Sequence, residues 1–189
     1  MINKIKNIEG DIILIISTAV MSFLVFGIIY TVVQQDLRQT ANDPQIQIAE
    51  DGATALGGGT AIPNWSQSVD IGKSLNSFII VYNEAGQPVA STGVLDGKVP
   101  TPPAGVLAAA KQSGENRITW QPRADVRLAA VVVYYSGKQS GYILSARSLK
   151  EVEKRESYTE YLASAGFLIS LFIILAAFSL GRFVRKYKI

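Results

Sequence analysis

Two long apolar runs lie near the ends of the chain, on either side of a polar middle. The first covers residues 12–35 and the second covers residues 161–181, and charged residues bound both. A helix that rises about 1.5 Å per residue needs roughly 20 residues to cross a ~30 Å hydrocarbon layer. Because backbone groups in lipid must be hydrogen-bonded internally, both runs are predicted to be transmembrane helices.

The charge pattern around these runs predicts their orientation. Basic residues precede the first run and follow the second: Lys4, Lys6, Arg182, Arg185, Lys186 and Lys188. The positive-inside rule therefore places residues 1–11 and the basic tail 182–189 in the cytoplasm, and residues 36–160 outside the cell membrane. That middle segment holds 12 basic and 13 acidic residues. Since its charges nearly balance, nucleic acid is not an expected partner, whereas the two apolar runs make the lipid bilayer one.

A cleaved signal peptide is the alternative interpretation of the first run. Its apolar stretch is longer than the usual signal core of about 7–15 residues, and no small-x-small cleavage site follows directly. The sequence after it, Thr31–Arg38, continues as a helix without a breaker. These features favour an uncleaved anchor.

Composition limits the chemistry that the chain can carry out. It has no cysteine and no histidine. Disulfides, Ser-His-Asp and Cys-His nucleophile systems and the usual zinc sites are therefore excluded. No glycine-rich phosphate loop or paired-carboxylate motif replaces them, so we expect neither an enzyme nor a bound cofactor. About 125 residues between the runs can bury one core, which predicts a single domain.

The polar middle begins with helical sequence and continues as strands. Asp43 suits an N-cap and Pro44 a first helical position, which predicts either a separate helix over residues 44–56 or one long helix kinked at the proline. β-Branched and aromatic residues predict strands, and these are separated by turn residues. The predicted strands cover residues 77–82, 87–92, 116–120, 126–135 and 142–147, a short helix covers residues 104–112, and loops cover residues 60–76 and 93–103.

Apolar residues occupy both faces of the strand over residues 126–135, which indicates a strand covered on two sides. After the last strand, Ser148 and Glu151 have the spacing of a capping box, and no proline interrupts the chain from there to Gly181. The predicted fold is therefore α+β, a five-stranded antiparallel sheet flanked by helices, with two transmembrane α-helices. The last strand is expected to pass directly into the second of these helices.

Three stretches carry a resemblance to a known family: Arg38–Pro44, Phe78–Gly86 and Gly141–Leu149. The order of elements around them resembles the extracytoplasmic PAS-like sensor domains of the single Cache type, found in bacterial histidine kinases and chemoreceptors. The resemblance implies a small ligand bound between the sheet and the helices beside it. It covers nearly the whole chain, although this family is characterised by architecture more than by invariant residues.

The sequence departs from that family at its C-terminal end. A kinase or chemoreceptor would continue into an output domain, whereas this chain stops eight residues after Gly181 and has no histidine to accept a phosphoryl group. Any signal is therefore expected to pass to a separate histidine kinase or chemoreceptor.

Candidate ligand-binding residues are the cation and the aromatic side chains of the predicted strands. Arg127 can hold a small carboxylate or amino-acid ligand by a bidentate pair, or it lies exposed at the start of its strand next to a carboxylate. Trp120, Tyr134, Tyr135 and Tyr142 line such a pocket, or they belong to the core. Asn42 and Asp43 are better explained by helix capping.

The sequence holds two further patterns, a possible glycosylation motif and a set of small residues in the second apolar run. Asn64-Trp65-Ser66 matches a glycosylation acceptor, which chance explains better in a chain of prokaryotic character. Small residues in or beside the second apolar run, such as Ala163 and Gly166, allow close helix packing, and a homodimer with four spans is expected.

The preferred hypothesis is a membrane-anchored sensor whose external domain binds a small ligand or partner and relays the change through its transmembrane helices. The alternative is an interaction or assembly protein that uses the same fold as a scaffold without a small ligand. A closed cavity between sheet and helices would support the first, and a solid core with an exposed apolar patch the second.

Overall fold

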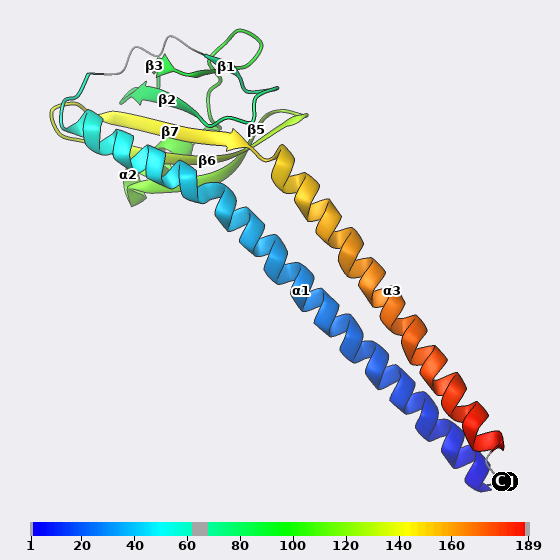
Figure 1. Ribbon diagram of the computed structural model, residues 1–189. Coiled ribbons are helices and arrows are strands. Elements are labelled where there is room, and N and C mark those ends of the chain that lie inside the picture. The colour runs from blue at the N-terminus through cyan, green and yellow to red at the C-terminus, as the bar shows by residue number, and fades with distance from the viewer. Residues whose placement is uncertain (1, 62–67, 188–189) are drawn as a thin grey trace. The chain divides into compact units, whose positions relative to one another are not determined.

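The computed structural model describes residues 2–61 and 68–187, and their side chains from residue 9 onward (Figure 1). The chain divides into two compact units. We call Leu37–Lys154 the domain, and Met1–Asp36 together with Arg155–Ile189 the helix pair. The helices of the described residues are α1 (Ile2–Gly57), α2 (Val106–Ser113) and α3 (Lys150–Tyr187).

The domain is built on a five-stranded antiparallel sheet with the order β3-β2-β7-β6-β5. Its strands are β2 (Phe78–Asn83), β3 (Pro88–Ser91), β5 (Glu115–Arg123), β6 (Val126–Tyr135) and β7 (Gly141–Ser148). The predicted α+β class with a five-stranded antiparallel sheet is confirmed. The structure adds a parallel pair within the predicted loops, β1 (Val69–Asp70) with β4 (Gly93–Val94).

The strand β6 has neighbours on both sides and apolar residues on both faces, as its sequence predicts. Val131 and Val132 point to opposite faces, and both are fully buried. The partner strand β5 forms an edge of the sheet, and its register shifts between Trp120 and Arg123. Pro122 lies at this irregularity, where a residue without an N–H removes no regular ladder bond.

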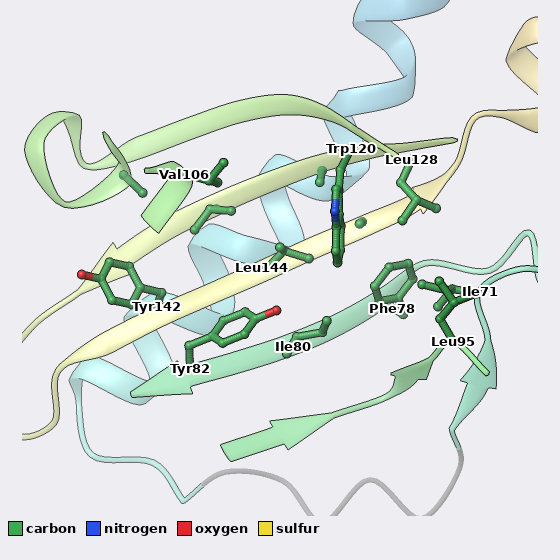
Figure 2. Close-up of a cluster of buried hydrophobic side chains, with 14 of the residues drawn as sticks. Ile71, Phe78, Ile80, Tyr82, Leu95, Val106, Trp120, Leu128, Tyr142 and Leu144 are labelled. Atoms are coloured by element: carbon green, nitrogen blue, oxygen red, sulfur yellow. The ribbon is translucent and has the colours of Figure 1, made fainter. Parts of the chain in front are cut away.

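One face of the sheet packs against α2 and the loops before it (Figure 2). Its core draws large side chains from four strands and the loops beside them: Ile71, Phe78, Ile80, Tyr82, Leu95, Trp120, Leu128, Tyr142 and Leu144. Complete burial of side chains of this size contributes about 1.5–3 kcal/mol each to folding. This face therefore carries the main core of the domain.

The other face of the sheet packs against the domain part of α1. Ala49, Ala53 and Leu56 of α1 meet Val131 and Ile143 of the sheet. In Figure 1, this cyan segment of α1 crosses the strands. Small side chains at intervals of four residues give α1 a smooth contact surface, because residues i and i+4 lie on the same side of a helix.

Pro44 lies inside α1, and the helix continues through it. Of the two alternatives, one long helix is therefore confirmed, and a separate helix that begins at Pro44 is wrong, as is the capping role given to Asn42 and Asp43. The Asn42 side-chain amide instead donates to the Arg38 carbonyl within the helix, at 3.3 Å. The apolar run before Pro44 and the buried contacts after it favour helix on both sides, which outweighs the loss of one backbone bond.

The last strand passes into α3 with a single intervening residue, Leu149. The Ser148 hydroxyl accepts a hydrogen bond from the Lys150 N–H at 3.2 Å. This differs from the predicted capping box, in which Ser148 pairs with Glu151. The difference arises because Ser148 is still a strand residue, so its hydroxyl reaches the N–H of Lys150, the first residue of α3, instead of that of Glu151.

The helix pair packs antiparallel along regularly spaced positions. Its partly buried residues recur at intervals of three or four, from Ile15 through Phe26 on α1 and from Ala163 through Phe178 on α3. The Phe23 and Phe167 rings meet edge to face at 5.7 Å. Near the chain ends, Asp11 pairs with both Arg182 (3.5 Å) and Arg185 (3.2 Å). Such spacing is typical of helices that pack at a shallow angle.

The outward side chains of the helix pair are apolar. Leu24, for example, is 52% exposed and Phe172 is 73% exposed. Among the described residues, the large exposed apolar side chains lie on the helix pair except for Leu75 and Val89. Both helices are long and apolar enough to cross a membrane. Exposed apolar surface of this extent indicates a lipid environment.

Candidate functional site

The predicted ligand position between the sheet and α2 is occupied by side chains of the protein. Trp120 is 2% exposed and Tyr142 is 5% exposed. The Tyr82 hydroxyl donates to the Pro100 carbonyl at 3.0 Å and thereby fixes the proline-rich loop over the sheet. Burial raises the pKa of Tyr82 far above the ordinary tyrosine value. Figure 2 shows Trp120, Phe78 and Tyr82 on this face, and their burial identifies Trp120 and Tyr142 as core residues.

Tyr134 belongs to a polar cluster at one end of the sheet. Its hydroxyl donates to Glu84 Oε1 at 3.1 Å, and Lys111 Nζ donates to the same oxygen at 3.2 Å. The Lys111 ammonium also lies 5.0 Å from the centre of the Tyr134 ring, which packs on Tyr142 at 5.4 Å. The hydrogen bond from Lys111 is the main reason that the pKa of Glu84 is lowered. The cluster joins α2 to two strands of the sheet.

Arg127 and Tyr135 lie on the face opposite Trp120. Tyr135 packs in the core beneath α1, and burial raises the pKa of its hydroxyl. Arg127 is half exposed and donates to Glu153 of α3 at 2.6 Å. The structure therefore does not bring the five predicted site residues into one pocket. Trp120, Tyr134 and Tyr142 share one face of the sheet, and Arg127 and Tyr135 share the other.

A buried polar network connects α1 to the sheet, and sequence reasoning missed it. Gln45 and Ser145 are both fully buried. The Ser145 hydroxyl donates to Gln45 Oε1 at 2.8 Å, and Gln45 Nε2 donates to the Ser77 hydroxyl at 3.1 Å. The available signal was the row Ala41, Gln45, Ala49 and Ala53, in which one amide interrupts small apolar residues at four-residue spacing.

The backbone of α1 approaches the sheet closely near this network. A Cβ atom on Gly52 would lie 2.3 Å from Ile143 Cδ1, so a larger residue cannot enter without a shift of the buried isoleucine. Arg147 lies on the same face of β7 as Ser145, since side chains alternate along a strand. Its Nε is buried and has no hydrogen-bond partner among the described residues. The contact between α1 and β7 therefore combines close packing with buried polar groups.

An open cleft lies where α1 ends above the end of β6, and we call it the α1–β6 cleft. Its volume is about 650 Å³. Its lining residues are Glu50, Ala53, Thr54, Gly57, Gly58, Val133, Tyr134, Tyr135 and Ser136. This size is within the range of small-molecule sites, about 300–1,000 Å³. Two of the predicted site residues, Tyr134 and Tyr135, contribute to it.

A second charged group fastens the loop between β4 and α2 to the sheet edge. Arg123 contacts Asp125 at 2.6 Å and Asp96 at 2.7 Å. These hydrogen bonds raise the pKa of Arg123 and lower that of Asp125, so the group stays charged. Among the described residues, no group of three or more acidic side chains is arranged to hold a metal ion. Arg123 and its two carboxylate partners therefore hold this loop against the edge of the sheet.

No protein-family model matches the sequence, and no curated protein is significantly similar to it. The candidate glycosylation site at residues 64–66 lies outside the described residues.

Proposed function

We propose that this chain is a membrane-anchored sensor of PAS-like architecture. Its domain would lie outside the cytoplasmic membrane, bind a small ligand or partner, and pass the change through α1 and α3 to a separate signalling protein. The observation that carries this proposal is a small cluster within the domain where α1, the sheet and the beginning of α3 meet.

That cluster consists of Ala41, Ala129 and Leu149, with Val152 packed against it. Leu149 is the single residue between β7 and α3, and its N–H donates to the Arg127 carbonyl at 2.9 Å. The domain part of α1 packs directly on the sheet, and α3 follows the middle strand of the sheet after one residue. A change in the domain would therefore reach both helices, whereas a flexible linker would absorb it.

The α1–β6 cleft is the site that this proposal favours. Glu50 and Thr54 on α1 face it, so an occupant would contact the helix that leads into the apolar run. The Glu50 carboxylate suits the amino group of an amino acid, and the ring of Tyr135 suits an apolar side chain. A ligand with only a carboxylate fits this lining less well, because Arg127 is paired with Glu153 on another part of the domain.

The basic residues near both chain ends support an orientation with these ends in the cytoplasm. The proposed topology is thus a two-pass protein with an extracytoplasmic domain. The proposed downstream partner is a histidine kinase or chemoreceptor in the same membrane.

A second function, an assembly scaffold without a small ligand, is favoured by one observation. The position between sheet and α2 is filled by Trp120 and its neighbours. In that case a protein partner would occupy the α1–β6 cleft, and the scaffold would need no metabolite.

Thermal unfolding of the full chain in lipid nanodiscs tests the proposal against this alternative. The panel comprises amino acids, amines and small carboxylates. A ligand at 100 times its dissociation constant adds about 2.7 kcal/mol to the stability of the folded state. We expect amino acids to raise the melting temperature, and Thr54→Trp, which fills the cleft, to abolish the shift. Thr40→Trp is the matched control, because Thr40 is exposed on the same helix away from the cleft.

Absence of a shift across the whole panel would remove the small-ligand function and leave the scaffold. A shift that survives Thr54→Trp would place the ligand elsewhere in the domain. Relay is tested separately by spin labels on cysteines introduced at Leu24 and Leu168, which the cysteine-free chain makes specific. A distance that stays constant when ligand binds would contradict the relay.

A further inference from the structure

A cavity of about 250 Å³ lies on the helix pair, outside every site described above. Four of its lining residues belong to α1 and four to α3: Phe23, Phe26, Gly27, Tyr30, Glu160, Ala163, Ser164 and Phe167. We propose that this cavity binds a phospholipid with a primary ammonium headgroup, with the ammonium at Glu160 and an acyl chain along Gly27 and Phe23. This inference rests on the proposed membrane insertion and on no other part of the proposed function.

Both helices contribute residues to the cavity in a regular pattern. The lining residues recur on each helix at i, i+3, i+4 and i+7, so each helix contributes one continuous stripe. Packing fixes the walls, because the Phe26 ring lies directly over Gly166 and Phe23 meets Phe167 at 5.7 Å. The open space comes from Gly27, where no atom lies within 4 Å of the position that a Cβ would take.

The lining combines one carboxylate with aromatic rings. A carboxylate attracts an ammonium group, and the faces of Phe and Tyr rings attract the same group through their quadrupoles. Tyr30 accepts a hydrogen bond from Gln34 at 3.2 Å, and its phenol proton remains able to donate to a phosphate oxygen. These features suit a headgroup that carries both an ammonium and a phosphate.

The position of the polar and apolar residues matches the axis of a lipid molecule. Glu160 bounds the second apolar run, whereas Phe23 lies seven residues inside Tyr30, a depth of about 10 Å along the helix. The carboxylate is thus expected at the headgroup level and Phe23 among the acyl chains. An anionic headgroup such as glycerol phosphate would be repelled by Glu160, which gives the site its selectivity.

Photo-crosslinking of the full chain in vesicles tests the inference. The probes are phosphatidylethanolamine and phosphatidylglycerol with the same diazirine-labelled acyl chain, each diluted into phosphatidylcholine, and labelled peptides are identified by mass spectrometry. We expect the ethanolamine lipid to label residues 23–30 and 160–167 roughly 5- to 10-fold more than the glycerol lipid. Glu160→Gln should remove that preference.

Gly27→Leu should abolish the labelling, because the new side chain fills the cavity without meeting another atom at its Cβ. Gly181→Leu is the matched control. No atom lies within 4 Å of the Cβ position at Gly181 either, and this residue ends the second apolar run, away from the cavity. The lipid probes should label the Gly181→Leu variant to the same extent as the natural chain.

Three results would overturn the inference: equal labelling by the two lipids, a preference that Glu160→Gln leaves unchanged, or crosslinks from the cavity residues to a second copy of the chain. Extraction at alkaline pH separates this failure from that of the proposed function. A chain that alkaline washing releases from the vesicles would contradict membrane insertion and both proposals. A chain that stays inserted without a lipid preference would overturn the lipid site alone.

Discussion

The buried network around Gln45 gives a prediction that the structure makes quantitative. In Gln45→Leu, the side chain keeps a similar volume but loses its bonds to Ser145 and Ser77. The Ser145 hydroxyl, which is fully buried, is then left without an acceptor, at a cost of about 1–3 kcal/mol. Ser77 is exposed and can bond to water, so its loss is smaller. We expect Gln45→Leu to lower the free energy of unfolding by about 2–3 kcal/mol.

A double-mutant cycle isolates the pairwise part of this effect. Ser145→Ala should cost about 1–3 kcal/mol, because it leaves the buried Gln45 carbonyl oxygen without its donor. When both partners become apolar, neither polar group remains buried and unpaired. The double variant Gln45→Leu/Ser145→Ala should therefore be more stable than the sum of the single changes implies, by about 1–2 kcal/mol.

Chemical denaturation of the full chain in nanodiscs measures these values, and the fluorescence of the buried Trp120 reports on the domain core. Gln47→Leu is the matched control: it is the same substitution two residues away on α1, at an exposed position. It should change stability by less than about 0.5 kcal/mol. If Gln45→Leu changed the free energy of unfolding as little as the control does, or if the changes at Gln45 and Ser145 were strictly additive, the network would not stabilise the domain.

Three further predictions follow from close contacts and one ion pair. Gly52→Leu should lower the free energy of unfolding of the domain by about 2–3 kcal/mol in the same denaturation assay, since its Cβ has no room. Gly166→Leu should displace the Phe26 ring, whose Cε1 would lie 2.5 Å from the new Cβ, and cysteine crosslinking between the two helices should weaken. Because Lys111 lowers the pKa of Glu84, this carboxylate stabilises the domain above its unfolded pKa, and the contribution is lost as pH falls through its folded pKa. The melting temperatures of the natural chain and of Glu84→Gln should therefore differ at neutral pH and converge once the pH falls below the lowered folded pKa of Glu84.

The fold was predictable where one physical signal dominated. The alternation along residues 126–135 placed apolar side chains on both faces of one strand, and the structure buries Val131 and Val132 on opposite sides. The two apolar runs were predictable as helices because each is long and apolar enough to cross a membrane, and the structure forms a helix over both. The parallel pairing of β1 with β4 was not predicted, because strands of two residues carry no periodic signal.

Pro44 shows how local propensity can be overridden. A proline inside a helix removes one backbone bond and disfavours the preceding turn, so a break or a kink was the natural expectation. The structure continues the helix from the apolar run to Gly57. Ala41 before the proline and Gln45 and Ala49 after it are all buried, and this burial favours helix on both sides of Pro44.

The candidate site was harder to predict than the fold. Tyr134 and Tyr135 are neighbours on one strand, so the alternation already placed their side chains on opposite faces of the sheet, although both residues line the α1–β6 cleft. Arg127 lies on the same face of the sheet as Tyr135. By the same alternation of side chains, Trp120 lies on the opposite face. The partner of Arg127, Glu153, lies 26 positions away along the chain, so no local pattern could reveal it.

One polar network lies in the contact between α1 and the sheet, and it affects the position of α1 along the strands. A displacement of α1 by one helical turn, about 5.4 Å, would exchange Ala49 for Ala53 against the sheet, but it would also bring Ile48 or Leu56 to the place where Gly52 now meets Ile143. It would also place Ala41 or Ala49 opposite Ser145, whose buried hydroxyl would lose its acceptor. The network and the close approach at Gly52 therefore select one register of α1 together, and the network acts as single buried polar residues do in coiled coils. A ligand that shifted α1 would have to outweigh that network, and the cleft beside Glu50 lies on the same helix within two turns of Gln45.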